Sequence, residues 1–264
     1  MKITEIKSCY LGPDISPEQL IQEHFFLYLS KGKMEGYDGK YHYLKPGNHC
    51  LVRKNRLARY NKQKVNNEFE KVVIIFDEHF LKQFQKKYNY FPDKRNHAMD
   101  AFIPLDKNEL LSNFLKSLNS YFTTSGSIND TFSDLKREEL LLILLKQQPE
   151  LTEVFFDFGV PGKIDIQEFM LKNYKFNVNI SHFAYLTGRS LSSFKKDFKE
   201  VFKSSPNRWL VKRRLEEAKF LIERNNKKPS DIYFDLGFED LSHFSYAFKK
   251  LFGISPSQLA EQHK

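Results

Sequence analysis

The sequence predicts an α+β chain in which a β-rich and then helical first part is followed by an all-α second part. Three observations predict this fold class. Short runs of β-branched and aromatic residues, typical of strands, recur along the chain up to residue 76. Helical periodicity of the apolar residues begins near residue 80. Within the last hundred residues, one pattern of phenylalanines occurs twice. A chain of 264 residues can bury the cores of two separately packed domains.

In the first part, strand-like runs alternate with Gly, Pro and Asn residues that favour turns. These runs are residues 25–29, 41–44, 50–52 and 72–76. After Asp77 the apolar residues recur at helical spacing. The predicted helices are residues 80–91, 107–122 and 132–147. Gly and Pro then interrupt both periodicities over residues 157–163, which we interpret as a linker.

The second part contains a duplicated unit. Phe194 to Pro206 and Phe244 to Pro256 share the frame Phe-x3-Phe-Lys-x2-Phe-x2-Ser-Pro, fifty positions apart. In each copy the three phenylalanines stand at i, i+4 and i+8, so they form the apolar stripe of a helix whose opposite side is polar and partly basic.

A short amphipathic segment and a glycine precede each copy. Gly188 and Gly237 can adopt the left-handed conformation that ends a helix, and Ser190 and Asp240 are suited to cap the next one. This pattern predicts two helix-turn-helix units, the motif in which the second helix lies in a DNA major groove. The units are residues 179–202 and 229–252.

One long helix is predicted between the two units. Residues 207–225 carry apolar side chains at helical spacing, with Pro206 before them and Asn226 after them. Such a helix spans about 28 Å. Successive major grooves on one side of B-DNA lie roughly 34 Å apart, so one chain could contact two adjacent grooves.

Residues 237–256 resemble the C-terminal signature of the AraC/XylS family of bacterial transcription regulators, and the resemblance extends over roughly residues 164–258. It implies a seven-helix DNA-binding domain, with a leading helix at about 164–174 and a terminal helix at 257–262. For the first part it implies a degenerate cupin-like β-barrel and a helical pair that senses a ligand or partner and often dimerises. The expected domains are residues 1–158 and 163–264.

The chain departs from the family pattern at two places. Tyr246 stands where the family often carries a basic residue, which affects a base contact. Leu259-Ala260 replace the usual aromatic-Arg pair after Pro256, which affects little more than packing.

The apolar stripe of each recognition helix must pack inward, which leaves the opposite side for DNA. By resemblance to the family, the candidate base contacts are Ser192, Lys195, Lys196, Leu241, Ser242, His243 and Tyr246. Lys196 leads this set because a lysine can donate to guanine O6 and N7, with a phosphate contact as the alternative. His243 could instead support the turn. Phosphate contacts position a protein on DNA but do not determine sequence preference. The candidates for them are Ser190, Lys199, Lys203, Lys249 and Lys250.

Basic residues are in excess in two regions. From Lys163 onward, nineteen Lys or Arg stand against twelve Asp or Glu, which favours salt-dependent DNA binding, with a solvated helical surface as the alternative. Residues 40–67 hold eight basic and no acidic residues. This segment could bind an anionic effector, DNA or a protein partner, or could form the polar faces and turns of strands.

The first part offers little sign of a ligand or of catalysis. Phe25, Tyr28 and Tyr43 could line an effector pocket inside the barrel, although aromatics at strand spacing more often belong to a core. His42 and His49 stand apart and lack the metal cluster of cupins, and Cys9 and Cys50 form no close pair. We therefore expect no enzyme, metal or cofactor.

No secretory signal, long apolar span or lipidation motif is visible, so a cytoplasmic, nucleoid-associated protein is expected. The sequence thus predicts a site-specific transcription regulator, most often an activator, with DNA and RNA polymerase as partners. A small-molecule effector or regulatory protein and a homodimer are further expected partners. The alternatives are a nonspecific architectural DNA binder and a cupin-like enzyme with an appended DNA-binding module.

Overall fold

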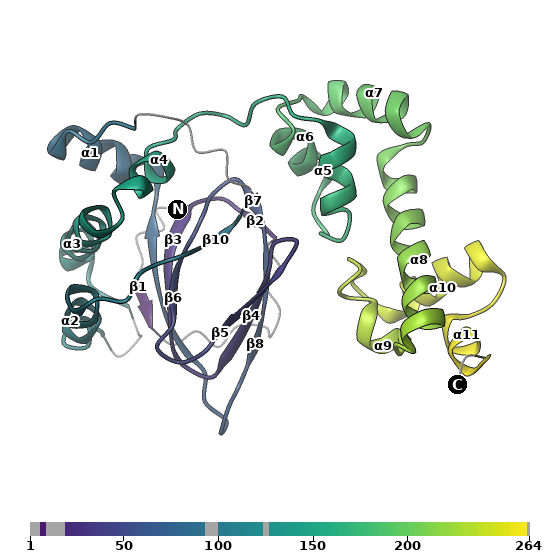
Figure 1. Cartoon of the computed structure of the whole chain (residues 1–264), viewed down its shortest axis with the longest axis horizontal. Helices are drawn as coiled ribbons and strands as arrows, with labels where there is room; N and C mark the ends of the chain where they lie inside the picture. The colour runs from purple at the N-terminus through teal and green to yellow at the C-terminus, as the bar shows by residue number, and fades with distance from the viewer. Residues whose placement is uncertain (1–5, 9–18, 93–99, 124–126, 263–264) are drawn as a thin grey trace. The chain divides into compact units, whose positions relative to one another are not determined.

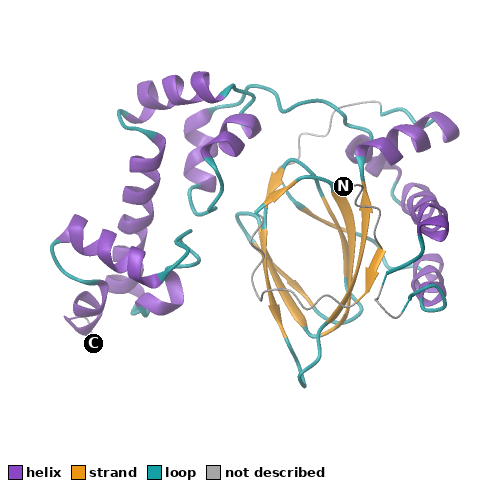
Figure 2. Cartoon of the chain, turned by 180° about the vertical axis from the view of Figure 1, so that it is seen from behind, coloured by secondary structure: helices purple, strands orange, loops and turns teal. Residues whose placement is uncertain are grey.

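The computed structural model describes residues 6–8, 19–92, 100–123 and 127–262. The chain divides into two compact units, Met1–Gly159 and Val160–Lys264 (Figure 1). The first contains β-sheets and a helical layer, whereas the described residues of the second form helices and loops alone (Figure 2). The predicted α+β fold class is therefore confirmed.

Three antiparallel sheets build the β part of the first unit. One sheet has the order β1-β9-β3-β6-β10, a second pairs β2 with β7, and a third has the order β5-β4-β8. The strands are β1 (Ile6–Ser8), β2 (Leu20–Ile21), β3 (His24–Lys31), β4 (Lys33–Tyr37), β5 (Tyr41–Leu44), β6 (His49–Val52), β7 (Arg56–Leu57), β8 (Arg59–Gln63), β9 (Glu70–Phe76) and β10 (Phe102–Pro104). All four predicted strands lie within this set.

Alternation along β3 divides the first unit into two apolar clusters. Leu27 and Leu29 join Met34 and other side chains in the cluster that the sheets enclose. Phe26 points to the other face of the sheet and packs in the cluster that the helices cover. The side-chain period of two thus gives the central strand one face toward the barrel interior and one toward the helical layer.

The helical layer comprises α1 (Glu78–Tyr88), α2 (Glu109–Leu118), α3 (Asp130–Gln147), the 3₁₀ turn η1 (Pro149–Leu151) and α4 (Thr152–Phe155). The three predicted helices are present, but two are shorter than expected. Asn89 adopts a left-handed conformation that ends α1 before residue 91. Asn108 caps α2 through the Leu111 amide, so this helix begins two residues later than predicted.

The three aromatics predicted to line an effector pocket lie in three different surroundings. Phe25 packs against the cluster inside the barrel. Tyr28 packs against the cluster under the helices. Tyr43 is 68% exposed, since Leu44, next to it on β5, is the residue that turns inward. The prediction that Tyr43 lines the interior is wrong.

The basic segment 40–67 is not simply a solvated surface. Lys40, Lys45 and Lys64 are exposed, but Arg53, Lys54, Arg59 and Lys62 are each less than a tenth exposed. Lys54 donates to Glu78 at 3.3 Å, Arg59 lies over the Tyr37 ring, and Lys62 lies over the Tyr60 ring. The interpretation as a solvated surface is therefore wrong for these four cations, which are buried in the β unit, although Arg53 and Lys54 do lie in the turn between β6 and β7.

The remaining candidate ligands of the first unit have structural partners. The His42 ring bonds to Asp38 at 2.8 Å, and Asp38 also accepts from the Ala101 amide. Burial raises the pKa of the Cys50 thiol to about 12, while Cys9 lies outside the described residues. In the described ranges, no three or more His, Cys, Asp or Glu side chains gather as a metal site. Nor does any helix there have the length and apolarity to cross a membrane.

The second unit consists of α5 (Ile166–Asn173), α6 (Ile180–Leu186), α7 (Leu191–Phe202), α8 (Pro206–Asn225), α9 (Pro229–Ile232), α10 (Leu241–Phe252) and α11 (Pro256–Gln262). The two predicted helices that carry the phenylalanine stripes, α7 and α10, and the long connector α8 are confirmed. The helix predicted after Pro229 is reduced to one turn, and residues 233–237 continue as hydrogen-bonded turns. Leu259 of α11 is buried in the core of this unit, as expected for its packing role.

Candidate nucleic-acid interface

Both helix-turn-helix units close their first helix in the same way. In the first unit the Gly188 amide donates to Tyr185 O and the Arg189 amide donates to Ala184 O, each at 2.9 Å. In the second, the Gly237 amide donates to Phe234 O at 2.9 Å and the next amide donates to Tyr233 O at 3.1 Å. This pair of bonds is the Schellman motif, in which a left-handed glycine turns the chain out of a helix. The φ angles of +66° and +83° at the glycines confirm their predicted role.

The second helix of each unit begins at the predicted cap. Ser190 Oγ accepts from the Ser193 amide at 3.2 Å, and Asp240 Oδ1 accepts from the His243 amide at 2.6 Å. One residue separates Gly188 from its cap, whereas two separate Gly237 from Asp240. The second turn is therefore one residue longer.

The phenylalanine stripes hold the recognition helices against the two halves of α8 (Figure 1). Phe198 and Phe202 pack on Trp209, with ring centroids 5.6 Å and 4.4 Å away. In the second unit, Phe244 and Phe248 are fully buried in a cluster with residues from the later turns of α8. This packing leaves the opposite side of each recognition helix toward solvent.

The structure places the predicted DNA-contacting side chains on these solvent sides. The exposed candidates on α7 and its ends are Ser190, Ser192, Lys195, Lys196, Lys199 and Lys203. On α10 they are Leu241, Ser242, His243, Tyr246, Lys249 and Lys250. Tyr246 is the most open aromatic residue of α10, at 67% exposed. The His243 ring lies 5.9 Å from the Phe238 ring, edge to face, so this histidine also supports the turn.

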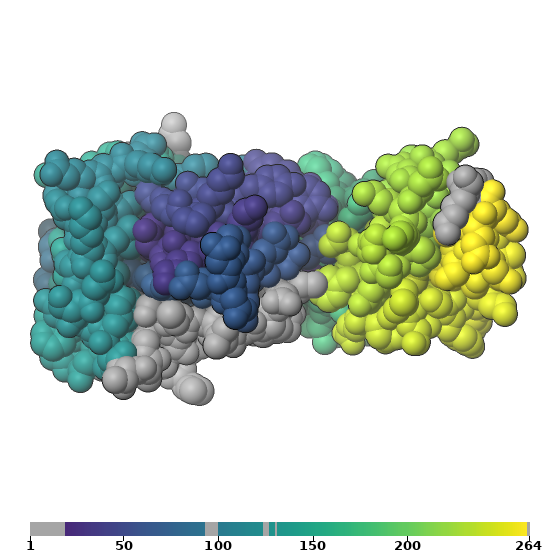
Figure 3. All heavy atoms as spheres, turned by 90° about the horizontal axis from the view of Figure 1, so that it is seen from below, coloured from purple at the N-terminus to yellow at the C-terminus, as the bar shows by residue number. Residues whose placement is uncertain are grey.

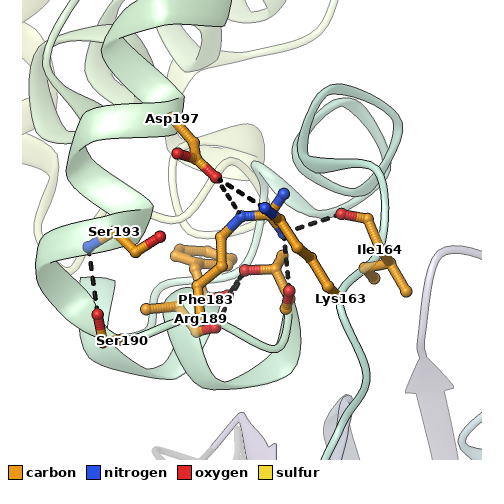
Figure 4. A network of polar contacts seen from close by, with 9 residues as sticks. Lys163, Ile164, Phe183, Arg189, Ser190, Ser193 and Asp197 are labelled. Carbon is orange, nitrogen blue, oxygen red and sulfur yellow. Dashed lines mark hydrogen bonds and ion pairs between the residues drawn. The ribbon is translucent and has the colours of Figure 1, made fainter.

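Arg189 holds the first turn against α7 through a network that the sequence did not reveal (Figure 4). Its guanidinium donates from Nε to Asp197 Oδ2 at 2.9 Å, and from Nη1 to Ile164 O and Thr187 O at 2.8 and 2.7 Å. The bond from Arg189 holds the pKa of the Asp197 carboxyl below its ordinary value, helped by the charge of Lys163. Arg189 is thus a structural cation although it stands next to candidate DNA contacts.

The chain segment that leads into α5, around Gly162 and Lys163, packs closely on the same turn. A Cβ at Gly188 would lie 2.4 Å from Gly162 C and 2.5 Å from Lys163 N. Only a glycine fits this contact and also tolerates the positive φ. Glycine is therefore required at position 188 for two reasons. The backbone there has a positive φ angle, and the neighbouring backbone leaves no room for a side chain.

The two units differ in charge. Residues 179–202 hold four basic and two acidic residues, whereas residues 229–252 hold two basic and four acidic ones. The acids of the second unit, all exposed, are Asp231, Asp235, Glu239 and Asp240. Of the two acids in the first unit, Asp197 is already neutralised by Arg189. The first unit therefore has the stronger attraction for a phosphate backbone.

Two family models match the chain. A model described as the ExsA N-terminal regulatory domain matches residues 24–154. A model described as a helix-turn-helix domain matches residues 183–262. The first match falls on the β part and its helical layer, and the second covers most of both helix-turn-helix units.

Individual curated proteins match about a third of the chain. The chain is 34% identical over 93 residues to the virulence regulon transcriptional activator VirF of Yersinia enterocolitica, an alignment covering 35% of this chain and 34% of VirF. It is 32% identical over 93 residues to the regulator ExsA of Pseudomonas aeruginosa, with the same coverage. The chain thus spans about a third of the length of these curated relatives. Apo ToxT from Vibrio cholerae aligns over 98% of this chain and 94% of its own, at 13% identity and a TM-score of 0.44.

Proposed function

The chain belongs to the AraC/XylS family of transcription regulators, and we propose that it is a sequence-specific DNA-binding activator whose two helix-turn-helix units read adjacent major grooves. One observation carries this proposal. Two recognition helices with buried phenylalanine stripes and exposed polar faces pack on one connector of 20 residues. A connector of that length spans about 30 Å, which suits neighbouring grooves on one side of B-DNA.

Within this proposal the exposed side chains have two roles. Residues near the start of each recognition helix read base edges, with Lys196 on guanine and Tyr246 or Ser242 in the second groove. Lysines farther along, such as Lys199 and Lys249, neutralise phosphates and fix the register. Leu241 offers an apolar contact to a thymine methyl group. The second helix-turn-helix unit has fewer basic than acidic residues. Its contribution to DNA binding therefore depends more on direct base contacts than on phosphate attraction.

We assign residues 163–264 to DNA binding and residues 1–158 to regulation. The match to an ExsA-type regulatory domain supports the second assignment. The regulatory input is a small molecule or a partner protein that acts on the β unit and its helical layer. VirF is described as an activator, which supports recruitment of RNA polymerase by this chain, in the cytoplasm and on the nucleoid.

We further propose that α2 and α3 mediate homodimerisation. Leu110 of α2 and Phe132 and Leu135 of α3 are 51%, 45% and 59% exposed. The layer to which these helices belong forms an outer surface of the first unit (Figure 3). Exposed apolar side chains on neighbouring helices favour a protein partner. Leu135→Glu should lower self-association measured by sedimentation, whereas a charge at the exposed Tyr43 should not.

A nonspecific architectural DNA binder is the second candidate, and the basic excess of residues 163–264 favours it. That charge alone gives affinity without sequence preference. A sequence-specific protein instead keeps a preference of about a thousandfold or more over unrelated DNA. We expect no catalytic activity under either proposal.

The proposal is tested by selecting bound sites from a random pool of double-stranded DNA with the purified full-length chain. We expect an asymmetric motif of two boxes about one helical turn apart. Lys196→Ala should relax one box and leave the other intact. Lys116→Ala, which removes the same charge from an exposed position of α2, should leave the motif unchanged. Binding that enriches no motif and follows only the salt concentration would contradict the proposed function.

A further inference from the structure

Arg214 of α8 binds the polypeptide backbone at three points. Its Nε donates to Tyr174 O at 2.7 Å, its Nη2 to Phe176 O at 2.8 Å and its Nη1 to Gly237 O at 2.9 Å. Each guanidinium nitrogen therefore has a carbonyl partner. Tyr174 and Phe176 lie in the segment between α5 and α6, and Gly237 lies in the turn of the second helix-turn-helix unit.

The burial of this cation is costly and shapes its surroundings. Arg214 is 6% exposed, and no carboxylate of the described residues pairs with it. Removal from water lowers its pKa to about 10. Tyr174 caps the C-terminal end of α5, where unpaired carbonyls and the helix dipole favour a cation. An apolar side chain would fill the same space without desolvating a charge, so packing alone does not account for an arginine here.

The segments that Arg214 joins also touch each other directly. A Cβ at Gly237 would lie 2.7 Å from Lys175 O and 2.8 Å from Arg214 Cζ. Asn177 Nδ2 donates to Glu239 Oε1 at 2.9 Å across the same contact. The lead-in to the first unit, the connector and the turn of the second unit therefore meet at one junction, with the guanidinium at its centre.

We propose that Arg214 is the positioning residue that fixes the distance and angle between the two recognition helices, so that the protein accepts one separation of its two DNA boxes. The guanidinium fork is planar and its donors have fixed directions. Two of the three carbonyls belong to the segment that leads into the first helix-turn-helix unit, and the third belongs to the turn of the second. Binding all three at once leaves little freedom for the two units to rotate about α8. Arg214 is buried and does not contact DNA itself. This inference rests on the proposed function, because it concerns the spacing between two DNA-binding helices.

The test is a spacer series on the selected site with the full-length protein. Probes carry the two boxes at the selected separation and with one or two base pairs inserted or removed. For the wild type we expect each single-base-pair change to cost about tenfold or more in affinity, equivalent to about 1.4 kcal/mol. Arg214→Met should flatten this profile to within about threefold while each box keeps its preferred bases. Lys212→Met, which removes a neighbouring exposed charge from α8, should keep the sharp profile.

Two further variants keep the test decisive if Arg214→Met does not fold. Arg214→Lys retains the charge but reaches fewer carbonyls, and Asn177→Ala removes an exposed bond at the same junction. Both should broaden the profile, Arg214→Lys more than Asn177→Ala. A profile that stays as sharp as that of the wild type in folded variants overturns the positioning role and leaves the proposed function intact. A wild type that shows no site preference instead overturns the proposed function, and this inference with it.

Discussion

The two helix-turn-helix units share a backbone design but differ in what holds their turns together. Both close the first helix with a Schellman glycine and cap the second with a polar side chain. After the glycine, the first unit places Arg189, which bonds to Asp197 and to the chain that leads into the unit. The second places Phe238, which packs on Phe244 with ring centroids 5.1 Å apart. One unit is held by a polar network and the other by an apolar core.

The two copies therefore share the residues that determine backbone geometry and differ in the residues that determine surface charge. The glycine, the cap and the phenylalanine stripe are retained in both copies because each controls backbone conformation or helix packing. The residues between them have diverged in charge, so that the first unit is basic and the second acidic outside α10. We therefore expect the same kind of substitution to have different consequences in the two units.

The largest effect is expected from Phe238→Ala. This side chain is 4% exposed, and truncating a buried phenylalanine costs about 3 to 5 kcal/mol of unfolding free energy through lost burial and the cavity left behind. Chemical denaturation followed by circular dichroism measures the loss. Selection from random DNA should show that the box read by α10 weakens before the box read by α7. A loss below about 1 kcal/mol would show that the second turn does not depend on this packing.

A smaller loss is expected from Arg189→Met in the first unit. Three hydrogen bonds from a buried guanidinium disappear and Asp197 is left without its nearest cation, which we expect to cost about 2 kcal/mol. Lys163→Met removes a cation that is 68% exposed and 3.8 Å from the same carboxylate. This control should cost less than about 0.5 kcal/mol. Equal losses in the two variants would mean that only overall charge near Asp197 matters.

The charge difference between the units predicts a measurable salt effect. Lys199→Ala should lower the slope of log affinity against log salt concentration by about one, as expected when one phosphate contact is lost. Lys116→Ala, a charge-matched change at an exposed position of α2, should leave the slope unaltered. Fluorescence anisotropy at several salt concentrations provides both slopes. A slope that responds equally to the two variants would remove α7 as the main phosphate-binding element.

The smallest effect concerns pH. The Arg189 bond lowers the pKa of Asp197 below the value of an unfolded aspartate, which is about 3.9. The resulting stability is fully present above that unfolded value and is lost as the pH falls through the lower folded value. Carboxyl titration by NMR should show the Asp197 pKa rising in Arg189→Met. An unchanged titration curve would show that this bond is absent in solution.

In residues 160–264, features set by neighbouring residues were predictable, whereas contacts between residues far apart in the sequence were not. Gly188, Ser190 and Phe194 act on neighbours a few residues away, so their spacing predicts the turn, the cap and the packed face. Arg189 and Arg214 bind carbonyls that lie 25 and about 40 positions away in the chain. No periodicity reports such contacts. The sequence alone therefore predicted where the recognition helices are and which face packs, and it missed the two arginines that brace them.

The first unit was harder to predict because side-chain direction in a sheet depends on register. A shift of one residue exchanges the two faces of a strand, and the run around Tyr43 does not specify which face is inward. The β4–β5 pairing of Glu35 with Tyr43 and of Met34 with Leu44 settles it, with Leu44 inside. The buried cations Arg53, Lys54, Arg59 and Lys62 were missed for a related reason, since basic residues are expected at the surface unless partners are known.

The central claim, that one chain reads two adjacent major grooves, is tested most directly by guanine N7 methylation protection on the selected site. We expect two protected windows about one helical turn apart on one face of the DNA. Lys196→Ala should abolish protection in one window, and Tyr246→Ala should weaken contacts in the other. A single window, or two windows that respond together to either substitution, would contradict the account.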